Sequence, residues 1–243
     1  MAESKLQVIL LQYTPDPEEI IAQAAKLCYS PASVAELKNQ IKNKDQAGFI
    51  EKLIDMRHLS PIEHVTFTFG VEGISRACSH QIVRHRLASY SQQSQRYVGQ
   101  QGKEKGGFHF IVPPSIEKIG KREWFLEKMK VIQEWYDELA GAFETNGESA
   151  LEDVRFLLPN AAETKIIITM NARELLHFFQ VRCCNRAQWE IRAMATEMLR
   201  LVKQVSPHIF KEAGPGCVHD TCPEGQMTCG QMDDVREKFK NLL

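Results

Sequence analysis

The sequence has no long apolar run and almost no net charge. Its first apolar stretch, residues 8–11, is bounded by charged residues and proline, so it is too short for a signal peptide or a membrane span. Thirty Lys and Arg residues against 31 Asp and Glu residues give a formal net charge of −1. No overall field therefore draws the chain to nucleic acid or to a membrane, and we expect a cytoplasmic protein that binds neither.

Several nucleotide-binding and catalytic motifs are missing. No GxGxxG follows an expected strand and no GxxxxGK[ST] occurs, so the glycine-rich phosphate sites of Rossmann and P-loop proteins are not supported. GxSxG, HExxH and the paired CxxC spacing of zinc sites are absent as well. A nucleotide bound by this chain would have to be held by arginine side chains.

The seven cysteines are odd in number and scattered, unlike a secreted disulfide framework. Cys183 and Cys184 lie side by side with no motif that marks a thiol nucleophile, so we expect buried, reduced thiols there. Near the end of the chain stands a possible Cys3His set: Cys217, His219, Cys222 and Cys229. A zinc or iron site, a disulfide and an ordered loop with free thiols all stay open, and we assign no metal ligand.

The pattern of apolar residues predicts an α+β fold. Strands are expected over residues 5–13, 65–71, 108–112 and 166–170. Helices are expected after residue 17 and over 34–43, 47–57, 74–86, 122–143, 149–158, 172–184 and 187–205, with a capping box at Ser33 and Glu36 and core packing for the aromatics of 122–143. Strands and helices do not alternate regularly and no linker splits the chain. We therefore expect one compact domain with a mixed or antiparallel sheet and long helices.

The most unusual segment carries three arginines, a histidine and several amides within sixteen positions, residues 81–96. If 74–86 is a helix, Gln81, Arg84 and His85 share one face, and Arg86 points away from Arg84. Guanidinium groups suit phosphate, and nearby hydroxyls and amides suit a sugar or base. The alternative is a solvated basic helix end whose charges offset the helix dipole.

A second basic cluster follows the last expected strand. Arg173 and His177 are four residues apart, whereas Arg182 is turned about 180° from Arg173 around an expected helix. The apolar residues between these arginines make it difficult for both to reach solvent without one lying near an acid. A structural ion pair is therefore as good an interpretation as a ligand site.

Taken in order, these blocks resemble the flavin-dependent thymidylate synthases. The signature RHR, seven residues, then S-x-R is matched by Arg84-His85-Arg86 with Ser94 and Arg96. Further matching blocks lie at residues 60–64, 87–90, 155–159, 171–173 and 182–191, so the resemblance covers residues 5–210. It implies the family's α+β subunit in a homotetramer with active sites shared between subunits. Residues 1–210 would be the synthase domain and residues 211–243 a cysteine-rich extension of unknown role.

The resemblance also implies the reaction and its ligands. NADPH reduces FAD, methylenetetrahydrofolate gives one carbon to dUMP, and the reduced flavin completes the methyl group of dTMP. By residue-to-residue match, the flavin would be held by Ser60, Glu63, Arg84, His85, Arg86, Leu87, Gln92, Asn171, Arg173 and His177. The dUMP would be held by Gln81, Arg84, Gln92, Gln93, Ser94, Gln95, Arg96, Arg155 and Arg182.

Two of these residues are the candidate catalytic groups. Arg182 is suited to stabilise negative charge on uracil, because a guanidinium cannot lose its proton. The Ser94 hydroxyl could act as a nucleophile, but no activating group lies near it in sequence, which favours a positioning role. Two rival hypotheses remain: a nucleotide- or RNA-binding module without redox chemistry, and a flavin-free synthase in which Cys183 or Cys184 attacks.

Overall fold

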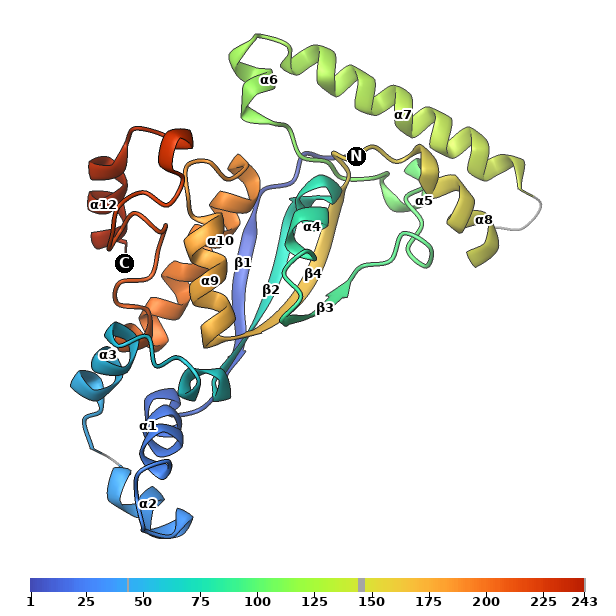
Figure 1. Ribbon diagram of the computed structural model, residues 1–243. Helices are drawn as coiled ribbons and strands as arrows, with labels where there is room; N and C mark the ends of the chain where they lie inside the picture. The colour runs from blue at the N-terminus through green and yellow to red at the C-terminus, as the bar shows by residue number, and fades with distance from the viewer. Residues whose placement is uncertain (43, 144–146, 243) are drawn as a thin grey trace. The chain divides into compact units, whose positions relative to one another are not determined.

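The computed structural model describes residues 1–42, 44–143 and 147–242. Its sheet is antiparallel, with the order β1-β2-β4-β3 (Figure 1). The strands are β1 (Gln7–Tyr13), β2 (Thr66–Ser75), β3 (Ala88–Gln92) and β4 (Glu163–Asn171). The predicted α+β domain with an antiparallel sheet and long helices is confirmed. None of the helices formed by the described residues is long and apolar enough to cross a membrane.

Within this domain the chain forms two compact units. Unit 1 consists of Met1–Gln7, Val71–Arg84 and Tyr90–Ile167, and unit 2 of Val8–Gly70, His85–Ser89 and Ile168–Leu243. The helices of unit 1 are α4 (Arg76–Ile82), α5 (Gly102–Lys105), α6 (Pro114–Lys118), α7 (Arg122–Ala142), α8 (Glu148–Val154) and the 3-10 helix η2 (Arg155–Leu157). Those of unit 2 are α1 (Pro17–Leu27), α2 (Val34–Ile41), α3 (Ala47–Asp55), α9 (Ala172–Arg182), α10 (Trp189–Val205), α11 (Pro207–Phe210) and α12 (Met232–Lys240), with 3-10 helices η1 (Pro61–His64) and η3 (Gly225–Met227).

The core of unit 2 is built on the apolar side of β2. Phe67 and Phe69 alternate with more exposed residues, as the period-two pattern predicts, and both are fully buried. The Phe67 ring meets Phe210 of α11 edge-on at 5.4 Å between centroids, and Phe210 in turn meets Phe179 of α9 at 5.9 Å. Burial of each such side chain stabilises the fold by about 1.5–3 kcal/mol. Strand β2, α9 and α11 are thereby held around one aromatic core.

In unit 1 the long helix α7 packs against α5, α6 and α8 (Figure 1). Its buried face is narrow and consists of Met129, Gln133, Tyr136 and Ala140. The expectation that all its aromatics are core residues is wrong for Trp124 and Trp135, which are 53% and 54% exposed. Trp135 directly precedes buried Tyr136, so it lies about 100° away from the buried face of the helix.

The helix expected over residues 74–86 is shorter than predicted. Ser75 ends β2, and its Oγ accepts a hydrogen bond from the Cys78 N–H at 3.0 Å, which sets the start of α4. At the other end, the Tyr90 hydroxyl donates to the Ile82 carbonyl at 2.9 Å and satisfies it as the helix stops. Arg84 and His85 therefore lie beyond the helix, and the predicted helical face shared with Gln81 is wrong.

Two further sequence expectations need correction. Residues 88–92, where the apolar pattern predicts no strand, form β3, because a strand at the edge of a sheet can be polar on exposed positions. The strand expected over 108–112 is reduced to isolated bridges from Phe110 to Glu3 and Ala162. The Ser33–Glu36 capping box is confirmed: Ser33 Oγ accepts from the Glu36 N–H at 3.3 Å, and Glu36 Oε2 accepts from the Ser33 N–H at 2.8 Å.

Gln133 is the polar residue on which unit 1 depends for its packing. Its Oε1 accepts from the Phe108 N–H at 2.8 Å, and its Nε2 donates to the Gln100 carbonyl at 2.8 Å. We expect Gln133→Met to lower the free energy of unfolding by about 1–3 kcal/mol, because backbone groups lose their partners. Denaturant unfolding of the purified variant measures this. The exposed neighbour Glu134 provides the control, since Glu134→Met should stay within about 0.5 kcal/mol of wild type; equal midpoints for both variants would contradict the role of Gln133.

Candidate functional site

Gln92, at the end of β3, is fixed inside unit 1. Its Nε2 donates to Ser79 Oγ and to Thr164 Oγ1, both at 3.0 Å, and both acceptor residues are buried. The next residue, Gln93, continues the sheet pairing through its N–H, which donates to the Lys165 carbonyl at 2.9 Å. The amide side chains expected around a ligand therefore start from a rigid strand and not from a free loop.

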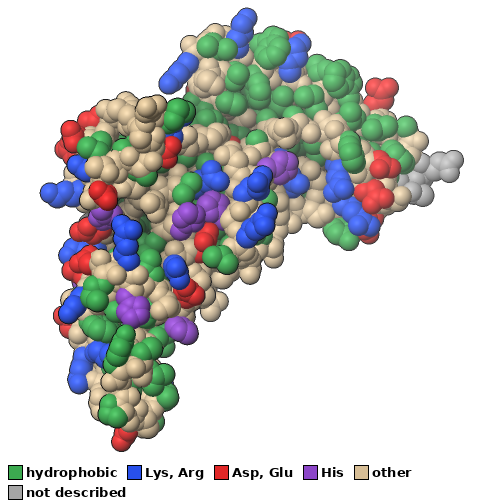
Figure 2. Space-filling model, viewed as in Figure 1, with side chains coloured by type: hydrophobic (Ala, Val, Ile, Leu, Met, Phe, Trp, Pro, Cys, Tyr) green, Lys and Arg blue, Asp and Glu red, His purple; other side chains and the backbone are tan. Residues whose placement is uncertain are grey.

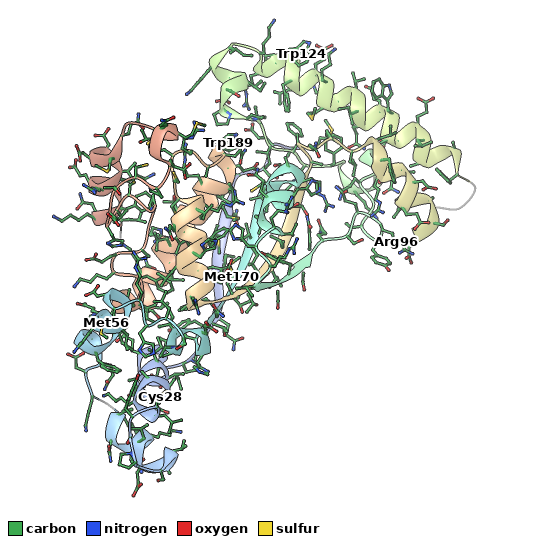
Figure 3. The ribbon with its side chains drawn as sticks, in the orientation of Figure 1. Cys28, Met56, Arg96, Trp124, Met170 and Trp189 are labelled. Carbon is green, nitrogen blue, oxygen red and sulfur yellow. The ribbon has the colours of Figure 1, made fainter. Side chains whose placement is uncertain are left out.

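Arg96 follows in the turn after β3 and is paired with two acids of α8. Its guanidinium contacts Glu148 Oε1 at 2.5 Å and Glu152 Oε2 at 3.1 Å, and all three side chains are more than 40% exposed. Figure 3 shows Arg96 beside this helix. Exposed pairs of this kind contribute little to stability, so an anionic ligand could replace the carboxylates. Ser94 Oγ accepts from the Arg96 N–H at 3.2 Å, which matches a positioning role within the turn.

Arg155 adds a second basic group to unit 1, and Arg76 adds a third that sequence reasoning missed. Arg155 Nε donates to the Glu152 carbonyl at 3.0 Å. Burial, and then the positive charge of Arg155, lower the pKa of Arg76 below its usual value. Because the positive charges of Arg76 and Arg155 act on one another, a negatively charged ligand beside them would be stabilised. The sequence signal was an arginine at the first position of a short helix, directly after the capping Ser75.

Unit 2 contains most of the residues that the family resemblance assigns to the flavin. Arg173, in the first turn of α9, forms an ion pair with Glu63 of η1, so the structural ion pair considered for this cluster does exist. Asn171 ends β4, and its Oδ1 accepts from the Glu174 N–H at 2.8 Å, which caps α9. Apart from buried His85, the other side chains of unit 2 on this list are exposed: Ser60 directly before η1, Arg86 and Leu87 between α4 and β3, and His177 in the middle of α9.

His85 is buried between two residues of α9. Its Nδ1 lies 3.2 Å from Glu174 Oε1, and its Nε2 accepts a hydrogen bond from Arg182 Nε at 2.9 Å. Burial, followed by the positive charge of Arg182, lowers the pKa of His85, while Glu174 acts in the opposite direction. Glu174 was not predicted from the sequence. It could have been found as a carboxylate among apolar residues of the expected helix, next to Leu175 and near Phe178.

The two basic clusters are thus each assembled within one unit. Unit 1 brings together Gln92, Gln93, Ser94, Gln95, Arg96 and Arg155, with Gln81 half-buried in α4 and Arg84 exposed just after it. In unit 2, Arg173 and Arg182 have different partners, Glu63 and His85, in agreement with their predicted opposite directions on α9. Figure 2 shows Lys, Arg and His side chains gathered on the middle of the face that it draws. Both clusters have the donors that phosphate groups require.

A family model and related sequences both match this chain to thymidylate synthases. The model of the Thy1 family, described as thymidylate synthase complementing protein, matches residues 9–208. The flavin-dependent thymidylate synthase of Geobacter sulfurreducens is 53% identical over 238 residues, covering 98% of this chain and 99% of its own. That of Clostridium tetani is 48% identical over 246 residues, covering 96% and 97%.

Solved structures share the fold at low sequence identity. The UMP/dUMP methylase PolB of Streptomyces cacaoi, bound with 5-Br dUMP, has a TM-score of 0.72 at 21% identity, covering 86% of this chain and 95% of that one. Thymidylate synthase X of Helicobacter pylori, with FAD and dUMP, has a TM-score of 0.65 at 21% identity, covering 86% and 99%.

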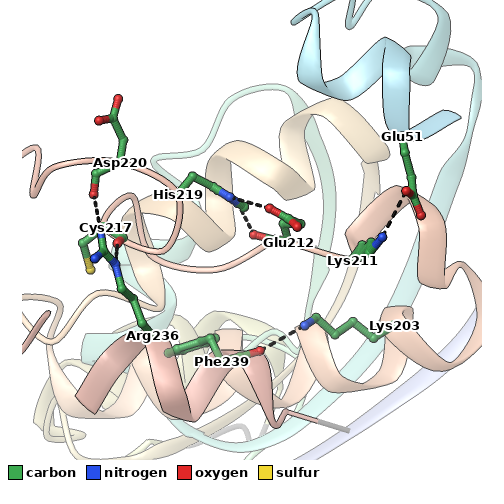
Figure 4. A network of polar contacts seen from close by, with 9 residues as sticks. All are labelled: Glu51, Lys203, Lys211, Glu212, Cys217, His219, Asp220, Arg236 and Phe239. Atoms are coloured by element: carbon green, nitrogen blue, oxygen red, sulfur yellow. Dashed lines mark hydrogen bonds and ion pairs between the residues drawn. The ribbon is translucent and has the colours of Figure 1, made fainter. Parts of the chain in front are cut away.

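The cysteine-rich extension, residues 211–243, is tied to the rest of unit 2 by polar contacts (Figure 4): Lys203 Nζ donates to the Phe239 carbonyl at 3.2 Å, and Lys211 Nζ donates to Glu51 Oε2 at 3.0 Å. Further contacts lie within the extension. Arg236 of α12 donates to the Cys217 carbonyl at 2.9 Å and to the Asp220 carbonyl at 3.0 Å. His219 Nδ1 pairs with Glu212 Oε2 at 2.8 Å, so it is turned toward a carboxylate. Over the residues that the structure describes, no group of three or more His, Cys, Asp or Glu side chains is arranged to hold a metal ion.

Cys183 does not have the environment of a nucleophile. Its side chain is buried in the core beyond α9, and burial raises the pKa of the thiol to about 12. At pH 8 only about one thiol in ten thousand would then be the reactive thiolate. This counts against the rival hypothesis of a flavin-free synthase that attacks through Cys183.

We expect Cys183 to resist alkylation in the folded protein. With iodoacetamide at pH 8, peptide mass spectrometry should find the exposed Cys28 modified and Cys183 unmodified until the protein is denatured. Cys28 is the internal control, because it reports that the reagent is active. Modification of Cys183 at a rate similar to Cys28 in folded protein would contradict its burial and revive the nucleophile hypothesis.

Proposed function

The chain belongs to the Thy1 family of flavin-dependent thymidylate synthases, and we propose how its own residues carry out the reaction. The substrate is dUMP, which is methylated to dTMP with methylenetetrahydrofolate as the one-carbon donor. NADPH is the reductant, and FAD passes the hydride from it to the new methyl group. The observation that carries the proposal is the pair of basic clusters at the positions of the family's motifs.

The flavin would be held mainly by residues of unit 2. Arg86 and Arg173 are exposed guanidinium groups, which suit the diphosphate of a dinucleotide, and exposed Leu87 offers an apolar surface to a ring. Polar contacts would come from Ser60 and Glu63 at η1, Asn171 at the end of β4 and His177 in the middle of α9. Arg84 and Gln92, from unit 1, and His85, from unit 2, complete the set that the family motif assigns to the cofactor.

The phosphate and sugar of dUMP would be held mainly by unit 1. Arg96 and Arg155 supply charge, and Arg96 would exchange its exposed carboxylate partners for the phosphate. Gln81, Arg84, Gln92, Gln93 and Gln95 supply amide and guanidinium donors for the sugar and base. We assign Ser94 a positioning role, because its hydroxyl is engaged in the turn with the Arg96 N–H.

Arg182 is the residue that we assign to the uracil ring. Transfer of one carbon to C5 of uracil requires negative charge to build on the ring, and burial keeps the Cys183 thiol protonated, so this thiol is not poised to create the charge by attack. A guanidinium stabilises such charge and keeps its proton at any physiological pH. The hydrogen bond to His85 fixes the direction of this guanidinium before the substrate binds.

Three features of the family complete the proposal. We propose a homotetramer in which active sites are shared between subunits, so that residues of the two clusters can come from different copies of the chain. We propose a cytoplasmic location, because the apolar run at residues 8–11 is too short for a signal peptide or a membrane span. Residues 1–210 would form the synthase domain, and residues 211–243 an extension that the chemistry does not require.

Replacement of Arg182 separates substrate chemistry from flavin binding. We expect Arg182→Ala to lower dTMP formation by at least about 100-fold, the scale of losing a group that stabilises developing charge, while bound FAD stays near one per subunit. Product is measured by liquid chromatography and cofactor by flavin absorbance. The control is Arg200→Ala, which removes a half-buried arginine paired with Glu197 in α10 and should keep both values. Joint loss of flavin and activity in Arg182→Ala would contradict the assignment to uracil.

A further inference from the structure

Glu174, His85 and Arg182 form a chain of hydrogen bonds inside unit 2. The His85 and Glu174 side chains are each 7% exposed, and their closest polar atoms lie 3.2 Å apart. Arg182 Nε lies 2.9 Å from the other ring nitrogen of His85. Glu174 and Arg182 stand at the two ends of α9, eight residues or about 12 Å apart along its axis. The imidazole of His85 therefore bridges the first and last turns of one helix.

The direction of each hydrogen bond follows from the chemistry of arginine. A guanidinium only donates, so His85 Nε2 must accept and cannot carry a proton. The neutral ring then carries its proton on Nδ1 and donates it to the Glu174 carboxylate. A positively charged imidazole would instead direct its Nε2–H at the Nε–H of Arg182. Only one protonation state of His85 is compatible with both contacts.

Several contacts hold Glu174 and the His85 ring in place. The Glu174 N–H is fixed by the Asn171 cap of α9 at 2.8 Å. The ring of Phe178 meets the His85 ring edge-on at 4.8 Å between centroids, and the His177 ring lies at 6.1 Å. The charged and titratable groups that act on His85 from α9 are Glu174, Arg182 and His177. The imidazole thus has little freedom to rotate, and Glu174 and Arg182 each act on one of its two ring nitrogens.

We propose that Glu174 is a positioning residue that keeps His85 in the Nδ1–H form, so that Nε2 holds the Arg182 guanidinium in the direction required by dUMP. The proposal rests on the assignment of Arg182 to uracil given above. Without an acceptor at position 174, the imidazole proton can move to Nε2, where it opposes the Arg182 N–H. Arg182 then loses its orientation, although it keeps its charge.

Two substitutions of Glu174 distinguish the loss of its hydrogen-bond acceptor from the loss of its negative charge. Glu174→Leu removes the acceptor at similar size, and we expect kcat for dTMP formation to fall about 10- to 100-fold, the usual cost of losing a partner that orients a functional imidazole. Glu174→Gln keeps an oxygen that can accept from Nδ1–H, so it should retain more activity than Glu174→Leu. Bound FAD should be unchanged in both.

The pH dependence of kcat tests the proposal, because it would not change if Glu174 had only a structural role. Activity should fall at low pH, because a second proton on the His85 ring places an N–H at Nε2, where it repels the Nε–H of Arg182. The carboxylate of Glu174 raises the pKa of His85 against the lowering by burial and Arg182. Glu174→Gln removes this negative charge, so the His85 pKa falls further and the acid limb of the kcat profile shifts to lower pH.

Glu197 provides a control, because it is a glutamate of α10 whose carboxylate is paired with Arg200 of the same helix. Glu197→Gln should leave the acid limb where wild type has it, even if thermal stability falls. Wild-type kcat and an unmoved acid limb in folded Glu174 variants would overturn the proposal. If Glu174→Leu does not fold, the acid limb of Glu174→Gln decides alone.

The test of the proposed role of Glu174 can be distinguished from the test of the proposed function. Wild-type protein that makes no dTMP would refute the function, while nitrogen-15 NMR of the histidine rings would still test the His85 proton. We expect Nδ1–H in wild type and a shift toward Nε2–H in Glu174→Leu. An Nε2–H form in wild type would overturn the proposal whatever the enzyme activity.

Discussion

The hydrogen-bond chain Glu174–His85–Arg182 is the constraint around which unit 2 is organised. Buried Glu174 and His85 can be withdrawn from water only if their donors and acceptors are matched, and each link to them, including that from half-buried Arg182, has a fixed direction. Glu174 and Arg182 can both reach one imidazole because they lie on one helix, two turns apart. Helix α9 must therefore begin at Asn171 and continue without a break to Arg182.

The apolar packing around this chain provides that rigidity. Asn171 is both the last residue of β4 and the cap of α9, so the sheet determines where the helix starts. Thr68 of β2 and Thr169 of β4 share a hydrogen bond at 2.9 Å just before that point. On the other side, Phe178 and Phe179 anchor α9 in the aromatic core. Sheet pairing and hydrophobic burial thus position the polar groups on which the chemistry depends.

Much of this could be predicted from local sequence pattern. The alternation through Phe67 and Phe69, the capping box at Ser33 and the helix after Asn171 all follow from interactions between residues close in sequence. The end of α4 could not, because it depends on Tyr90, eight residues later, reaching back to the Ile82 carbonyl. Glu174 was also missed, because nothing local explains a buried carboxylate until its partner His85, 89 residues away, is in place. The arginines were found because their motif is compact, whereas their partners are distant in sequence.

The most direct test of the central claim, that this chain uses a bound flavin to reduce and methylate dUMP, is a visible absorption spectrum of the purified protein, followed by anaerobic addition of NADPH with and without dUMP. The account predicts an oxidised-flavin spectrum that bleaches on NADPH addition, and bleaches faster with dUMP present. A colourless protein that takes up no added FAD would contradict it and would favour a nucleotide-binding module without redox chemistry.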